Sequence, residues 1–235
     1  MEFGRAVTVL ADEVSTITSL LTTEALAAPV PTCPGWAVAD LVKHLGVVHR
    51  WARHAVLVGP DGHFQGPADD EQIRQWFGDG AAALIETLTE TDPARACWTL
   101  IGPGTAAFWM RRQAHETTLH RWDLENSLGV PNGVEEDLAL DGIDEVATML
   151  MPRQLLLGRL ASSQEAIEVV PDRGPRSRLS VTTELVSTPS CAAVYGPAEA
   201  LWLLLWKRTT LDDPRLSVSG SRAAAARLLA QSLTP

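Results

Sequence analysis

Cysteine is scarce in this sequence of 235 residues. The three cysteines, Cys33, Cys97 and Cys191, lie far apart and form no C-x-x-C pair. That spacing excludes a disulfide framework and a cluster of zinc-bound thiolates, and it is typical of a protein in a reducing compartment. Because the first residues also lack the pattern of a signal peptide, we expect a cytoplasmic protein.

Basic charge and long apolar runs are scarce too. The formal net charge is −10, the isoelectric point is about 5.0, and Lys and Arg form no long run. Nucleic acids and anionic membranes bind clustered Lys and Arg, so we expect neither of them as a partner. The most apolar run, residues 200–207, is far too short to span a bilayer.

Several catalytic signatures are absent as well. The sequence contains no P-loop, no G-x-S-x-G and no G-x-G-x-x-G that follows a predicted strand. The usual grounds for predicting a nucleotide-binding protein or a serine hydrolase are therefore missing. Hydrophobic residues nevertheless make up 46% of the chain and charged residues 20%, so we expect a real core in one or two domains.

The spacing of apolar residues predicts two parts. Apolar residues recur every three or four positions in the first part, whereas later segments are short, β-branched and separated by proline, glycine and aspartate. We therefore predict an α+β protein, with a helical part at residues 1–152 and a small α/β part at residues 153–235. The predicted helices are 4–26, 38–58, 71–90, 105–127, 135–151, 196–209 and 221–233, the last with Ser221 as N-cap. The predicted strands are 165–172, 178–185, 190–196 and 215–220, and residues 91–104 are predicted as loop, with a turn at 102–104.

The helix predicted at 105–127 carries a stripe of ionisable residues. At about 100° per residue, Arg112, His120 and Asp123 fall within about 40° of Glu116, on a face with large apolar side chains. Buried charged groups are costly unless they are paired or bind a metal, so the stripe indicates a metal or acid–base site. A surface network of i, i+4 pairs is the alternative. His115 lies about 100° from Glu116, so we do not expect it at the site.

The helix predicted at 38–58 offers a partner for this stripe. His44 shares its side of the helix with apolar residues such as Leu41, whereas His49 lies about 140° away. We therefore expect His44 to be the inward histidine. A lone inward histidine is more often a hydrogen-bonded core residue than a metal ligand, and that alternative stays open here.

Together, His44, Glu116 and His120 would supply two nitrogen ligands and one oxygen ligand. Three such ligands with an open position form the pattern of a catalytic zinc site, and the same set also suits non-haem iron. Arg112 and Asp123 would then orient the ligands through hydrogen bonds.

Three segments carry a family resemblance. They are "CPGWAVADLVKHLGVVHRWA" at 33–52, "RRQAHETTLHRWDLE" at 111–125 and "AAVYGPAEALWLLLWKRT" at 192–209. The first two resemble the DinB-like, mycothiol-dependent maleylpyruvate isomerase family of actinobacteria. The third is similar to the C-terminal domain of that family, which itself resembles sterol carrier proteins. The resemblance covers nearly the whole chain.

The resemblance implies a DinB-like four-helix bundle followed by a small, sterol-carrier-like α/β domain. It implies one divalent metal, usually Zn2+, held by His44, Glu116 and His120, with mycothiol as the thiol cosubstrate. A thiol bound to zinc has a lowered pKa and is a thiolate near pH 7. In the isomerase that gives the family its name, the thiolate adds to a cis double bond, rotation follows, and elimination gives the trans product. Arg208 matches an arginine implicated there in substrate handling.

The sequence departs from the family at one position and leaves the substrate open. Ala37 stands where relatives often have Thr or Ser, so Asp40 lacks its capping-box partner. The ligand pattern does not identify the electrophile, and a mycothiol S-transferase or thiol-exchange enzyme is the alternative reaction. A non-catalytic module that binds a small ligand in the C-terminal part is a third possibility, and a purely structural role of His44 and His120 is a fourth.

Overall fold

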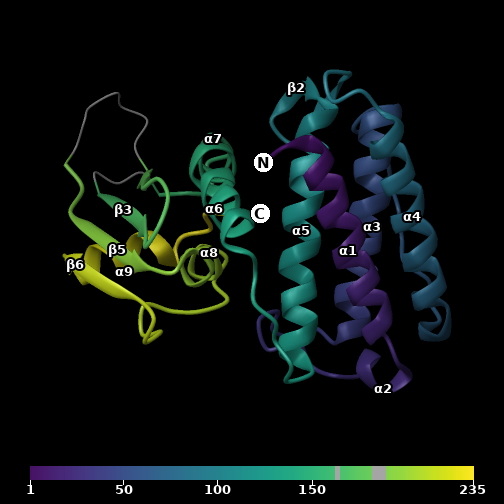
Figure 1. Cartoon of the computed structure of the whole chain (residues 1–235), viewed down its shortest axis with the longest axis horizontal. Coiled ribbons are helices and arrows are strands. Elements are labelled where there is room, and N and C mark those ends of the chain that lie inside the picture. Colours follow the sequence, from purple (N-terminus) through teal and green to yellow (C-terminus); the bar gives the residue numbers. More distant parts are fainter. Residues whose placement is uncertain (162–164, 182–188) are drawn as a thin grey trace. The chain divides into compact units, whose positions relative to one another are not determined.

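A computed structural model describes residues 1–161, 165–181 and 189–235 of the chain. The chain divides into two units, residues 1–133 and 134–235 (Figure 1). This division lies earlier than the predicted boundary at residue 152. The reason is that helix α6 (Glu136–Glu145) packs against helix α8 (Ala198–Leu205) within the second unit.

Four long helices dominate residues 1–133, all of which the structure describes. Helix α1 packs against α4 and α5, and α3 also packs against α4 and α5, so that the helices lie side by side as a bundle (Figure 1). Their apolar faces form one core, in which Trp109 is the largest fully buried side chain. The four helices are α1 (Phe3–Leu20), α3 (Val38–Leu57), α4 (Ile73–Glu90) and α5 (Ala106–Ser127).

The helix predicted at 4–26 is interrupted. Helix α1 ends at Leu20, and a short helix α2 (Thr23–Leu26) follows. The hydroxyl of Thr22 accepts a hydrogen bond of 3.1 Å from the backbone N–H of Ala25 and so caps the new helix. A threonine in this position satisfies an N–H that has no partner inside the helix. The apolar repeat continues across this break, which is why the spacing did not reveal it.

The prediction of a loop at 91–104 is correct for residues 91–95 and 100–101, but it is wrong for residues 96–99, and the turn predicted at 102–104 is wrong. Strands β1 (Ala96–Thr99) and β2 (Gly102–Thr105) form an antiparallel hairpin, with Cys97 opposite Gly104. The hairpin packs against helices α3 and α5, and Trp109 donates its indole N–H to the carbonyl of Trp98 at 2.7 Å. A strand written G-P-G-T has no apolar alternation, so its pairing depends on these tertiary contacts.

In the described part of residues 134–235, a mixed four-stranded sheet has the order β4-β3-β5-β6. Strand β3 pairs with β4 and β5 pairs with β6 in antiparallel fashion, while β3 and β5 run parallel. Ile167 and Val169 are buried and lie opposite the buried Ala192 and Val194. Helices α8 and α9 pack against these two strands. The bounds are β3 (Ala166–Pro171), β4 (Ser177–Ser180), β5 (Ala192–Gly196), β6 (Ser217–Gly220) and α9 (Arg222–Ala230).

The predicted strands agree with these four, except that residues 182–185 of the second lie outside the described residues. Ser221 caps α9, as predicted, by accepting a hydrogen bond of 3.2 Å from the N–H of Ala224. Helix α6 widens into a π-helical stretch, η2 (Val146–Leu150), before α7 (Met151–Leu156). Pro152 follows that stretch, and it has no N–H to donate to the carbonyl of residue 148. In the described residues, no helix combines the length and the apolarity that crossing a bilayer requires.

Candidate metal centre

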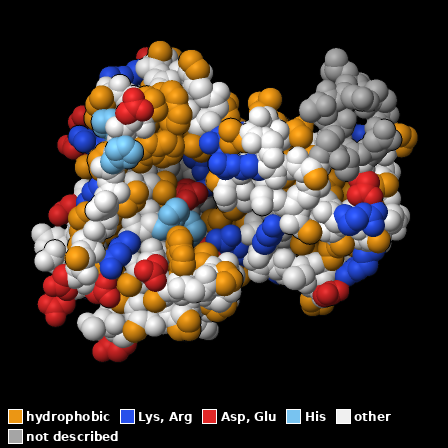
Figure 2. Space-filling model, turned by 180° about the vertical axis from the view of Figure 1, so that it is seen from behind, with side chains coloured by type: hydrophobic (Ala, Val, Ile, Leu, Met, Phe, Trp, Pro, Cys, Tyr) orange, Lys and Arg blue, Asp and Glu red, His pale blue; other side chains and the backbone are white. Residues whose placement is uncertain are grey.

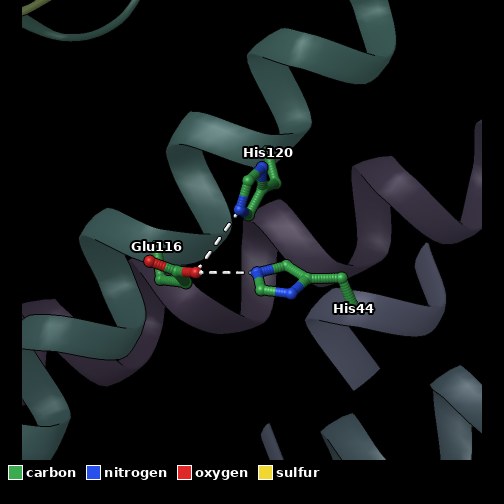
Figure 3. A group of neighbouring side chains, drawn as sticks. All are labelled: His44, Glu116 and His120. Atoms are coloured by element: carbon green, nitrogen blue, oxygen red, sulfur yellow. Dashed lines mark ion pairs between the residues drawn. The ribbon is translucent and has the colours of Figure 1, made fainter. Parts of the chain in front are cut away.

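Two histidines and one glutamate point toward one another in the bundle (Figure 3). Oε1 of Glu116 lies 3.3 Å from Nε2 of His120 and 3.5 Å from Nε2 of His44. One ligand atom from each of the three residues lies within 4.8 Å of the other two. The structure therefore brings together the three residues that the sequence predicted as metal ligands.

Helix geometry explains this convergence. Glu116 and His120 are four residues apart on α5, so their side chains lie on the same face of that helix. Helix α3 packs against α5 and brings His44 to the same point from a position far away in the sequence. The two imidazole rings meet edge to face, with ring centroids 5.3 Å apart. The site thus depends on the packing of two helices.

The donor set and its spacing fit a divalent metal ion. Ligands about 2.0–2.1 Å from a tetrahedral zinc ion lie about 3.3 Å from one another. The distances of 3.3 Å and 3.5 Å measured from Glu116 agree with this separation. Two imidazole nitrogens and one carboxylate oxygen leave a fourth position for a small molecule, as in catalytic zinc sites.

Arg112 keeps the Glu116 carboxylate charged. Burial alone would raise the pKa of Glu116, but the Arg112 guanidinium and hydrogen bonds from His120 and His44 hold that pKa well below its usual value. Nη2 of Arg112 contacts Oε2 of Glu116, which leaves Oε1 to face the two histidines. The two carboxylate oxygens therefore have different partners, and the predicted role of Arg112 as a support agrees with this geometry.

Asp123 and Thr32 lie behind His120. Oδ2 of Asp123 lies 3.0 Å from Nδ1 of His120, and Oδ1 accepts a hydrogen bond of 2.6 Å from the hydroxyl of Thr32. With the proton on Nδ1, the lone pair of His120 Nε2 faces Glu116. Burial alone lowers the pKa of His120, but its hydrogen bonds to Asp123 and Glu116 raise this pKa to about 9. A cation bound at this site would therefore displace the proton from Nε2 and leave the one on Nδ1. Ligating histidines in metal sites are commonly held by a carboxylate in this way.

The site opens on the side of His44. The side chain of His44 is 38% exposed, whereas those of Glu116 and His120 are 15% and 9% exposed. Trp36 lies against His44, with ring centroids 5.3 Å apart. Figure 2 shows histidine side chains at the surface of the helical unit, among hydrophobic and acidic side chains. A small molecule would therefore approach the three ligands past His44 and Trp36.

Two other histidines of these helices are buried outside the cluster. His115 is fully buried on α5 and does not belong to the three-residue cluster, as predicted. The expectation that His44 is the inward histidine of its helix is wrong in one respect, because His49 is fully buried and His44 is not. Nε2 of His49 lies 3.0 Å from the hydroxyl of Thr117, and its ring packs 5.5 Å from that of Phe77. The angular argument missed this because α4 and α5 together cover the flank of α3 that carries His49.

The predicted residue Arg208 belongs to the second unit. Its backbone N–H bonds the carbonyl of Leu203 at 2.8 Å, and its side chain donates to the carbonyl of Trp206 at 2.8 Å. Lys207 before it has a left-handed conformation, with φ of 60°, and its N–H bonds the carbonyl of Leu204 at 3.0 Å. These two hydrogen bonds form the C-terminal cap of α8. The left-handed position of such a cap, here Lys207, is usually glycine. The role of Arg208 toward a substrate stays a prediction.

The start of α3 retains half of a capping box. Asp40 accepts a hydrogen bond of 2.9 Å from the backbone N–H of Ala37, while Ala37 has no side-chain acceptor to return it. The expectation that Asp40 lacks its partner is thus correct only for the second bond of the box, the one that a side chain at position 37 would accept from the N–H of Asp40.

The helix bundle, the small α/β unit and the convergent His–Glu–His cluster define a class: α+β proteins whose helical bundle carries a group of residues that could hold a metal ion. Residues 7–125 match the model of the mycothiol maleylpyruvate isomerase N-terminal domain, and residues 137–227 match that of the C-terminal domain of the same family. The chain therefore belongs to the mycothiol maleylpyruvate isomerase family, which is a family of enzymes.

Solved structures and curated proteins complete the comparison. The fold is similar to that of the mycothiol-dependent maleylpyruvate isomerase, with a TM-score of 0.69 and 13% sequence identity over 94% of this chain and 95% of that one. A histidine-to-alanine mutant of that isomerase gives a TM-score of 0.68 and 12% identity over the same shares. No curated protein matches the sequence. At such low identity the structural likeness shows the shared fold.

Proposed function

We propose that this protein is a divalent-metal-dependent enzyme that uses mycothiol as a thiol cosubstrate and isomerises a cis double bond of the maleylpyruvate type. The observation that carries the proposal is the convergence of His44, Glu116 and His120 at ligand distances, in a chain of this family. A divalent cation held by these residues would lower the pKa of a coordinated thiol and favour the thiolate near neutral pH. Zinc is the ion that suits this ligand set best.

The residues around the proposed cation divide into ligands and groups that support the ligands. His44, Glu116 and His120 hold the cation, Arg112 keeps Glu116 ionised, and Asp123 keeps the proton of His120 on Nδ1. The exposed side of His44 admits the thiol and the substrate. Arg208 matches the family arginine that is implicated in substrate handling, and we assign it the same part here.

The proposed reaction conserves all atoms. The thiolate sulfur adds to one carbon of a double bond that is conjugated to a carbonyl group, and the electron pair moves toward that carbonyl. Rotation about the resulting single bond follows. Loss of the thiolate then restores the double bond in the trans arrangement, so that the thiol is regenerated.

Metal analysis tests the metal site directly. We expect about one zinc per chain in protein purified without chelators, and loss of that metal in Glu116→Ala and His120→Ala, because each removes one of three protein ligands. Glu24→Ala is a matched control, since Glu24 is exposed at the start of α2 and lies outside the cluster. A metal-free wild-type protein would contradict the proposal. Thiol-dependent turnover of a maleylpyruvate-type substrate is the second measurement.

Transfer of mycothiol to another electrophile is the alternative reaction of the same site. The three ligands fit either reaction, because both need a thiolate, and only the fate of the thiol differs. Mass spectrometry of the products separates them: an isomerase returns the free thiol, whereas a transferase leaves a stable thioether.

A small-ligand-binding role of the second unit is a further candidate. A cavity of about 440 Å³ in this unit is lined by Leu204, Leu211 and Leu229, with Lys207 and Arg222 among its polar residues. Leucine and alanine side chains share its walls with polar and charged ones, so a small ligand with an apolar part and a polar group would suit it. A protein with full metal loading that turns over no electrophile with any thiol would favour this role.

A further inference from the structure

The loop that precedes α3, residues 29–37, is tightly closed by its own backbone. The N–H of Val30 bonds the carbonyl of Trp36 at 2.9 Å, and the N–H of Trp36 bonds the carbonyl of Cys33 at 3.0 Å. Pro29 and Ala37 also form an isolated β-bridge. Gly35 sits in the turn with φ of 85°, where a side chain would be strained. The loop thus has a defined shape before any ligand is present.

This loop sends one side chain to His44 and another to Asp123, the carboxylate that holds His120. Trp36 packs against His44, with ring centroids 5.3 Å apart. Thr32 donates its hydroxyl proton to Oδ1 of Asp123 at 2.6 Å, and Asp123 in turn holds His120 at 3.0 Å. A segment of nine residues therefore contacts both the α3 branch and the α5 branch of the site.

We infer that Thr32 is a positioning residue of the metal centre, which acts on His120 through Asp123; the inference rests on the proposed metal site. A carboxylate can rotate about its own bond unless both oxygens are held. Among the contacts of Asp123, the bond from Thr32 to Oδ1 helps to keep Oδ2 in line with Nδ1 of His120, and so keeps Nε2 aimed at the position between Glu116 and His44. Groups that support a ligand in this way commonly change metal affinity when they are lost.

Burial strengthens the inference. Asp123 is fully buried and His120 is 7% exposed, whereas Thr32 is half-buried, so the hydroxyl of Thr32 bonds a carboxylate that has no exposed surface of its own. The bond also joins residues 91 positions apart in the sequence, and it ties the loop before α3 to α5. Loss of the Thr32 hydroxyl should therefore change the orientation of Asp123 and, through it, that of His120.

The test compares Thr32→Val with Thr32→Ser in the full chain. Valine keeps the branched shape and lacks the hydroxyl, whereas serine keeps the donor. We expect the dissociation constant for Zn2+, measured by competition with a chromophoric chelator, to rise about tenfold in Thr32→Val and to stay within about twofold of wild type in Thr32→Ser. The visible spectrum of the Co2+-loaded protein should change in Thr32→Val alone, because that spectrum reports ligand geometry.

Two further variants make the test decisive. Thr22→Val removes a helix cap on α2 and should lower stability without touching the site, so its Zn2+ affinity should equal that of wild type. Thr32→Ala, measured in parallel, covers the case in which the buried methyl group of valine disturbs folding. Equal Zn2+ affinity and equal Co2+ spectra in wild type, Thr32→Val and Thr32→Ala would overturn the positioning role of Thr32 and would leave the proposed metal site standing. A wild-type protein that binds neither ion would overturn the proposed metal site itself.

Discussion

His49 should make the stability of this protein depend on pH between about 7 and 5. Its imidazole is fully buried and shares a hydrogen bond of 3.0 Å with the hydroxyl of Thr117. Burial lowers the pKa of His49 to about 3, and the negative charge of Glu116 only partly opposes this effect. In the unfolded chain a histidine has a pKa of about 6.5.

The sign and size of the effect follow from these two values. Because the folded-state pKa of His49 is depressed, its contribution to stability is fully present above about pH 6.5 and is lost as the pH falls toward 3. Between these values the unfolded chain binds one more proton, so stability falls by about 1.4 kcal/mol per pH unit. From pH 7 to pH 5 the expected loss from His49 is about 2 kcal/mol.

His49→Gln isolates this contribution. Glutamine can keep the hydrogen bond to Thr117 with its amide nitrogen, and it does not take up a proton. The free energy of unfolding is measured by urea denaturation at pH 5 and pH 7, with the same zinc loading for each protein. Since the variant keeps the same metal ligands and carboxyl groups, its loss between the two pH values should be smaller than that of wild type by about 2 kcal/mol.

His63→Gln supplies the matched control, because it makes the same substitution at an exposed position outside the core. Losses in wild type and His49→Gln that agree within about 0.5 kcal/mol would refute the reasoning, since the buried imidazole would then make no difference between folded and unfolded states.

Two stability predictions follow from other buried contacts. Arg121 bonds the buried Glu125 at 2.6 Å and also the carbonyl of Gly133, so Arg121→Met should lower the free energy of unfolding by about 3–5 kcal/mol in guanidinium denaturation; a loss below about 1 kcal/mol would contradict a buried ion pair. A Cβ atom on Gly142 would lie 2.4 Å from the indole nitrogen of Trp202, so Gly142→Ala should lower the melting temperature through a loss of about 1–3 kcal/mol. Gly4→Ala, with open space around it, should not destabilise the protein, and equal melting temperatures of the two variants would argue against the close packing of α6 and α8.

Much of the helical unit was predictable because its apolar residues repeat with the period of a helix. The same periodicity placed Arg112, Glu116, His120 and Asp123 on one face of α5, where the structure has them. Contacts within one helix depend only on residue spacing, so the sequence contains them directly.

Burial and pairing between elements were harder to predict. The sequence did not reveal that His49 is buried, since a position on one helix does not say which neighbouring helices cover it. Strand β2, with its two glycines and one proline, has no pattern of its own and is held by β1 and the bundle. Thr32 sits in a proline-rich loop, and nothing in the spacing links it to Asp123; the C-P-G-W motif beside it was the available signal.

By itself, the sequence determined the two-part α+β organisation, the acidic charge, and the set of His44, Glu116 and His120 as candidate ligands. Local periodicity and composition are sufficient for the organisation and the charge, because they depend on neighbours along the chain, whereas the choice of His44 also rested on the family resemblance. Only the tertiary structure decided that the three ligand atoms meet within 4.8 Å, that one loop brings Trp36 to His44 and Thr32 to Asp123, and that α6 belongs with the second unit. These features join residues far apart in the sequence, and they exist only where the packed core brings the segments together.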